Sequence, residues 1–69
     1  MAERITGAMQ TPDGYWRVET IRSGRDQWFR IWHANTVVEA RASIETVARI
    51  LGHDALANLQ PVDVEGGAA

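Results

Sequence analysis

The stretch that decides the fold is QWFRIWH, residues 27–33. Side chains alternate across a β-strand, so Phe29 and Ile31 point to one face and Trp28 and Trp32 to the other. The run therefore reads as a central strand that is apolar on both faces. One sheet with one helix covers only one of these faces. The second aromatic face must then meet a partner, a ligand, a nucleic acid or solvent.

Turn signals on both sides of this run predict an antiparallel sheet. The strands are expected at residues 15–22, 27–33 and 36–40. The segment 23–26 is rich in turn-forming residues, and the pair 34–35 fits a two-residue turn because asparagine tolerates positive φ. The third strand is short and rich in β-branched residues.

A helix is predicted after the third strand. Ser43 supplies an N-cap oxygen, and Gly52 is the residue type that ends a helix. Leu56 and Leu59 are expected on a further short turn, which Pro61 ends. The buried stripe of the helix is expected to be Ile44, Val47, Ala48 and Leu51. The predicted fold class is α+β: a three-stranded antiparallel sheet, order 1-2-3, with one main helix packed on one face.

The two turns agree on which face the helix covers. The four-residue turn sets Val18 opposite Ile31, and the two-residue turn sets Val38 opposite Ile31 on its other side. A shift of one residue in either pairing would move these side chains to the opposite face of the sheet, so the agreement supports this register. The helix residues Ile44, Val47 and Leu51 are therefore expected to pack on Val18, Phe29, Ile31 and Val38.

The opposite face is expected to stay open. Its residues are predicted to be Tyr15, Arg17, Glu19, Ile21, Trp28, Arg30, Trp32, Val37 and Glu39. Arg17 lies across from Trp32, which favours a cation–π contact. Arg30 is expected to contact both Glu19 and Glu39, as a charge ladder over three strands.

Length and composition predict a single small domain over residues 15–64, with a flexible arm at 1–14 and a disordered tail at 65–69. A core of about a dozen apolar side chains is near the minimum for an isolated domain, which favours association. The chain has no cysteine, and its seven basic residues are all arginine, as is common in GC-rich bacterial genomes. The first residues lack the apolar region of a signal peptide, and no run approaches a membrane span, so we expect a cytoplasmic protein.

Tryptophan, tyrosine and arginine are the residue types most enriched in interface hot spots. We therefore expect a non-catalytic interaction module that forms a homodimer or binds a protein partner. The candidate contact residues are Tyr15, Arg17, Ile21, Trp28, Arg30, Trp32 and Val37. Two alternatives stay open. The arm, the 56–59 segment or the tail could fold over this face, and the edge strand 36–40 could pair with another chain.

Catalysis has little support in the sequence. The two histidines, His33 and His53, stand 20 residues apart and belong to no metal-ligand or catalytic spacing. No glycine-rich phosphate loop follows a strand. We expect no enzyme activity, no cofactor, no metal and no small-molecule substrate.

The segment from Tyr15 to Gly52 resembles the AP2-type and integrase amino-terminal DNA-binding domains in its order of elements and in carrying arginine and tryptophan on the sheet. Those domains lay the open sheet face in the major groove, so the resemblance implies a DNA-binding accessory factor as the alternative function. The charge disfavours it, because phosphate contacts dominate affinity and this chain carries a net charge of -2.

Overall fold

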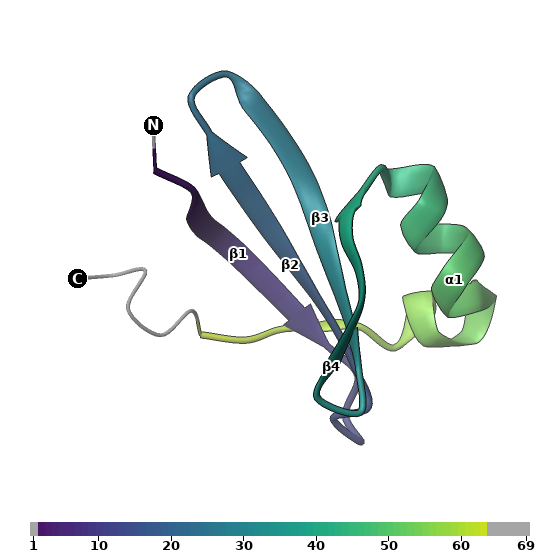
Figure 1. Cartoon of the computed structure of the whole chain (residues 1–69). Coiled ribbons are helices and arrows are strands. Elements are labelled where there is room, and N and C mark those ends of the chain that lie inside the picture. Colours follow the sequence, from purple (N-terminus) through teal and green to yellow (C-terminus); the bar gives the residue numbers. More distant parts are fainter. Residues whose placement is uncertain (1, 64–69) are drawn as a thin grey trace.

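The sheet has five strands in the order β4-β3-β2-β1-β5, and every neighbouring pair is antiparallel. The strands are β1 (Arg4–Gln10), β2 (Trp16–Ser23), β3 (Asp26–His33), β4 (Thr36–Ala42) and β5 (Gln60–Pro61). The structure is a computed structural model and describes residues 2–63. One helix, α1 (Ile44–Ala57), forms within these residues and lies on one face of the sheet (Figure 1). The α+β class and the neighbouring order of the three predicted strands are confirmed.

The prediction of only three strands is wrong, because part of the expected amino-terminal arm forms β1. Ala8 pairs with Glu19 of β2 and is buried, and Ile5 pairs with Ile21. A β-bulge between Ile5 and Gly7 interrupts this pairing. The bulge breaks the alternation by which a strand is recognised, and glycine is a weak strand former. The tail predicted at residues 65–69 lies outside the described residues.

The predicted register between β2 and β3 is confirmed along both strands. Val18 pairs with Ile31, Arg17 with Trp32, and Ile21 with Trp28. The turn into β4 also forms as expected: Ala34 and Asn35 have φ values of 50° and 66°, the two positive values that a two-residue hairpin turn requires.

The register between β3 and β4 differs from the prediction beyond the turn. Two irregularities each add a residue to β4, so Ile31 pairs with Glu39 and Phe29 with Ala42. Val38 is therefore 47% exposed, although it was expected under the helix. Ala42 takes the buried position instead, at 3% exposure. Val38 is the extra residue of the first irregularity, and the two inserted residues together bring Ala42 opposite Phe29, which explains the exchange.

The helix begins as predicted. The hydroxyl oxygen of Ser43 accepts a hydrogen bond from the Thr46 N–H at 3.3 Å, which satisfies one of the free donors of the first turn. Val47 and Leu51 are buried against the sheet. Ile44 is 62% exposed, so its expected place in the core is wrong. Ile44 is the first residue of the helix, and the buried residues of the helix begin one turn later, at Val47.

Gly52 divides α1. Its φ of 84° and ψ of 170° are non-helical, so a short helical turn follows the main helix, as predicted. Leu56 and Leu59 from this region pack against the main core. That core consists of Val18, Ile31, Ala42, Val47 and Leu51. Within residues 2–63, no helix is both long enough and apolar enough to cross a membrane.

Candidate functional site

The face of the sheet opposite α1, here called the open face, is partly a second small core. Ile21 is 1% exposed and Trp28 is 8% exposed. The guanidinium carbon of Arg41 lies 4.1 Å from the centre of the Trp28 ring, within cation–π distance. Ile5 of β1 pairs with Ile21 on its other side. Two predicted contact residues, Ile21 and Trp28, therefore lie beneath the surface and support it from within.

The centre of the open face is a buried carboxylate. Glu19 is 6% exposed. Its Oε1 accepts a hydrogen bond from the Trp32 indole nitrogen at 2.8 Å, and its Oε2 pairs with the Arg17 Nε at 3.1 Å. Buried charges persist in proteins when they are paired and hydrogen-bonded, and Glu19 meets both conditions. These bonds hold the indole of Trp32 toward β2.

The contacts of the arginines differ from the predicted ladder. Arg30 pairs with Glu3 at 3.4 Å, and no contact with Glu19 or Glu39 forms among the described residues. Glu39 is paired with Ile31 by the irregular register and is not beside Arg30. The predicted cation–π contact between Arg17 and Trp32 is likewise replaced, because both side chains bind Glu19. The ladder prediction is wrong because Arg17 and Trp32 bind both oxygens of Glu19 and because the irregular register pairs Glu39 with Ile31.

The Arg17 guanidinium is also held from β1. Its Nη1 donates to the Gln10 Oε1 at 3.3 Å. The network therefore joins Gln10 of β1, Arg17 and Glu19 of β2 and Trp32 of β3. Sequence reasoning missed Gln10 and Glu3 because it did not assign β1.

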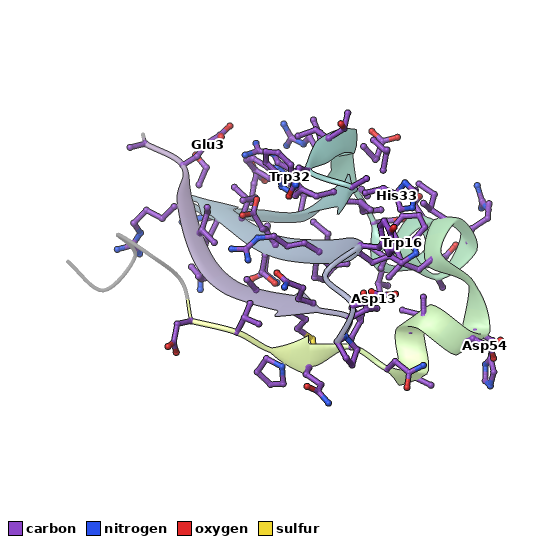
Figure 2. The ribbon with its side chains drawn as sticks, turned by 90° about the horizontal axis from the view of Figure 1, so that it is seen from below. Glu3, Asp13, Trp16, Trp32, His33 and Asp54 are labelled. Carbon is purple, nitrogen blue, oxygen red and sulfur yellow. The ribbon has the colours of Figure 1, made fainter. Side chains whose placement is uncertain are left out.

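The exposed part of the open face surrounds Trp32. Val37 pairs with Trp32 across β3 and β4 and is 39% exposed. Trp32 itself is half-buried, and the side chains of Arg17 and Arg30 are 30% and 26% exposed. In Figure 2, Trp16 and His33 lie next to α1 and Trp32 lies farther from it. Of the seven predicted contact residues, Arg17, Arg30, Trp32 and Val37 therefore come together at the surface.

Tyr15 stands at the end of the sheet, where a tight turn positions it. It is 57% exposed, and its ring stacks on His33 with centroids 6.0 Å apart. The Thr11 hydroxyl donates to the Asp13 Oδ1 at 2.6 Å, and the Tyr15 N–H donates to the same oxygen at 3.0 Å. These bonds favour the ionised carboxylate and lower the pKa of Asp13 from 3.8, the Thr11 hydroxyl having the larger effect. Thr11 also accepts from the Trp16 N–H at 3.1 Å, which ties the turn to β2.

Comparison with known proteins adds no assignment: no family model, curated protein or solved structure matches the chain. Between residues 2 and 63, no three histidine or acidic side chains come together in a way that could hold a metal ion. The arrangement at Trp32 is suited to non-covalent contact: an aromatic ring fixed by a buried carboxylate, an exposed valine beside it, and two arginines at its edge.

Proposed function

We propose that this protein is a non-catalytic interaction module of the cytoplasm, which associates with itself or with a protein partner through the open face. The contact residues are Arg17, Arg30, Trp32 and Val37. One observation carries the proposal: the half-buried Trp32 indole is held by the buried carboxylate of Glu19 at 2.8 Å. An aromatic side chain that is already ordered loses little entropy on binding, which is the property of a good interface anchor.

The buried part of this face supports the same surface. Ile21 and Trp28, with the Arg41 guanidinium over the indole, form a packed base along β2 and β3. A packed base keeps the exposed side chains above it in fixed positions. This is the preorganisation that an interaction site requires.

The alternative routes have less support. Pairing through the edge strand β4 is disfavoured by its two irregularities, because β-bulges are a common protection of sheet edges. Sheet-mediated DNA binding is disfavoured because many phosphate contacts dominate its affinity, whereas the whole chain carries a net charge of -2.

Val37→Asp tests self-association, and Val38→Asp is its matched control. The two valines are neighbours on β4 and are 39% and 47% exposed. Only Val37 pairs with Trp32. We expect the wild-type chain to form a dimer by multi-angle light scattering, since two-fold dimers are the commonest association of identical chains. Val37→Asp should reduce the mass to that of a monomer, and Val38→Asp should keep the dimer.

Three outcomes contradict the proposal in distinguishable ways. A wild type that is monomeric at about 1 mM excludes self-association, because even a dissociation constant of about 1 mM corresponds to a binding free energy of only about 4 kcal/mol. Equal loss of mass in both variants places the contact on the β4 edge. A dimer unaffected by Val37→Asp removes the open face from the interface.

A further inference from the structure

We propose that the open face binds an acidic, extended peptide segment of a protein partner, with an apolar side chain on Trp32 and carboxylates on Arg17 and Arg30. This inference rests on the proposed function, because it names the chemistry of the partner for the same face. It follows from the unused hydrogen-bonding capacity and the charge beside Trp32.

The carboxylate beside Trp32 is already occupied. Glu19 accepts through Oε1 from Trp32 and through Oε2 from Arg17, and its side chain is 7% exposed. Glu19 therefore neutralises part of the charge of Arg17 from within the face, and little of the Glu19 side chain is exposed to solvent. Asp26 lies at the far end of β3, six residues from Trp32 and about 20 Å along the strand. The charges at the edge of the indole are those of Arg17 and Arg30, which are 30% and 26% exposed, and that of Glu3, which is 55% exposed and pairs with Arg30.

Both arginines keep N–H groups for a ligand. A guanidinium carries five N–H donors. Among the described residues, Arg17 uses its Nε for Glu19 and its Nη1 for Gln10. Within residues 2–63, Arg30 uses only Nη2, at 3.4 Å to Glu3, whose side chain is 55% exposed. Arginine donors in a planar fork match the two oxygens of a carboxylate.

The spacing of the two arginines fits an extended peptide. Arg17 pairs with Trp32 and Arg30 pairs with Glu19, so the two arginines are diagonal neighbours on adjacent strands. Diagonal neighbours lie about 7–8 Å apart. An extended chain presents the side chains of residues i and i+2 on one face, about 6.6 Å apart. Two carboxylates at that spacing can therefore meet both arginines, while an apolar residue of the same face packs on Trp32 and Val37.

Nucleic acid fits these observations less well. Its affinity comes from many phosphate contacts, whereas within residues 2–63 the two arginines beside the half-buried indole are Arg17 and Arg30. The whole chain also carries a net charge of -2. A protein segment needs only two charged contacts and an apolar anchor, which is what this surface supplies.

The experiment is a titration of the isotopically labelled full chain, followed by NMR. The probe is a synthetic ten-residue peptide with leucine and two glutamates at alternating positions. The comparators are the same peptide with lysine in place of glutamate, and a single-stranded oligothymidine. The indole N–H signal of Trp32, assigned by its absence in Trp32→Phe, reports on the site. We expect this signal to shift with the acidic peptide alone and the shift to weaken with added salt.

Charge variants locate the contact. Arg30→Gln should weaken binding of the acidic peptide about threefold, as loss of an exposed ion pair does, and Arg30→Glu about tenfold, because the reversed charge also repels the carboxylates. Arg49 is an exposed arginine of α1 and is the matched control. Arg49→Gln and Arg49→Glu change the net charge equally and should alter the affinity less than about twofold, because screening limits long-range effects.

Any of three results overturns the inference. The acidic peptide at millimolar concentration leaves the Trp32 signal unmoved, the Arg49 variants weaken binding as much as the Arg30 variants do, or the oligothymidine shifts the signal more than the peptide. The first two leave the Val37-dependent association of the proposed function standing. The third replaces a protein partner by single-stranded nucleic acid.

Discussion

Trp32→Phe isolates the hydrogen bond on which the open face depends. The substitution keeps an aromatic ring and removes the indole N–H that donates to the Glu19 Oε1 at 2.8 Å. The Glu19 side chain is only 7% exposed, so water replaces the lost donor poorly. Hydrogen bonds to charged groups contribute about 1.5–3 kcal/mol. We expect the free energy of unfolding to fall by about 2 kcal/mol from this bond alone, plus a smaller loss of apolar contact.

Trp16→Phe is the control for that loss of contact. Trp16 is also half-buried on the sheet, and its indole nitrogen makes no hydrogen bond among the described residues. The difference between the two variants therefore reports the hydrogen bond to Glu19. Urea unfolding followed by far-UV circular dichroism measures it. With a slope of about 1 kcal/mol per molar urea for so small a domain, the midpoints should differ by about 2 M.

Equal destabilisation by Trp32→Phe and Trp16→Phe, within about 0.5 kcal/mol, would refute the reasoning, because it would mean that the bond to Glu19 contributes nothing beyond packing. A double-mutant cycle with Glu19→Gln gives a second measure. If the two side chains interact as the distance indicates, the cycle should return a coupling of about 1 kcal/mol or more. A coupling near zero contradicts the same conclusion.

Three further predictions concern the core and the turns. Ile31→Ala should destabilise the fold by about 2–5 kcal/mol in urea unfolding, because Ile31 is fully buried beneath the helix and truncation leaves a cavity; a loss below about 1 kcal/mol contradicts its central place. Gly52→Ala should cost about 1–3 kcal/mol, because Gly52 has a φ of 84° and nothing within 4 Å of an added Cβ, so the whole cost is backbone strain. Gly7→Ala, which meets only an ordinary contact at 3.9 Å, is its control and should change stability by less than about 0.5 kcal/mol in the same assay. Thr11→Val should raise the pKa of Asp13 toward 3.8 in an NMR titration, because the hydroxyl that most lowers this pKa is gone; an unchanged pKa contradicts the assigned cause. Since the folded pKa of the wild type is depressed, the stability that Asp13 contributes is present above pH 3.8 and is lost as the pH falls below that value.

The features that sequence reasoning predicted correctly are set within a few residues of the chain. The positive φ values of Ala34 and Asn35 belong to one tight turn. The cap of Ser43 binds three residues away, and Gly52 ends the main helix by its own φ. The pairing of β2 with β3 follows from the short turn between them and from the alternation in both strands. Each of these depends on neighbours along the chain, and neighbours are visible in a sequence.

The errors about the open face have a different origin. Glu19 had three basic or donor side chains within reach by register, and the sequence could not rank them. Only the packed structure shows that Arg17 and Trp32 take its two oxygens while Arg30 turns to Glu3. The competing contacts differ by about 1 kcal/mol or less, so small shifts of strand position decide between them. The burial of Trp28 beneath Arg41 has the same origin, because the guanidinium comes from a strand displaced by two bulges.

The sequence by itself therefore determined that a central strand with two apolar faces would pair with its neighbours in one register and receive a helix on one face. Periodicity and turn geometry are properties of short segments, and they suffice for that much. The tertiary structure decided that the expected arm joins the sheet as β1, that two extra residues displace β4, and that Trp32 stands over a buried carboxylate. These outcomes depend on contacts between residues far apart in the chain. Which of the competing contacts is the most favourable is decided only when the strands are packed together in the sheet.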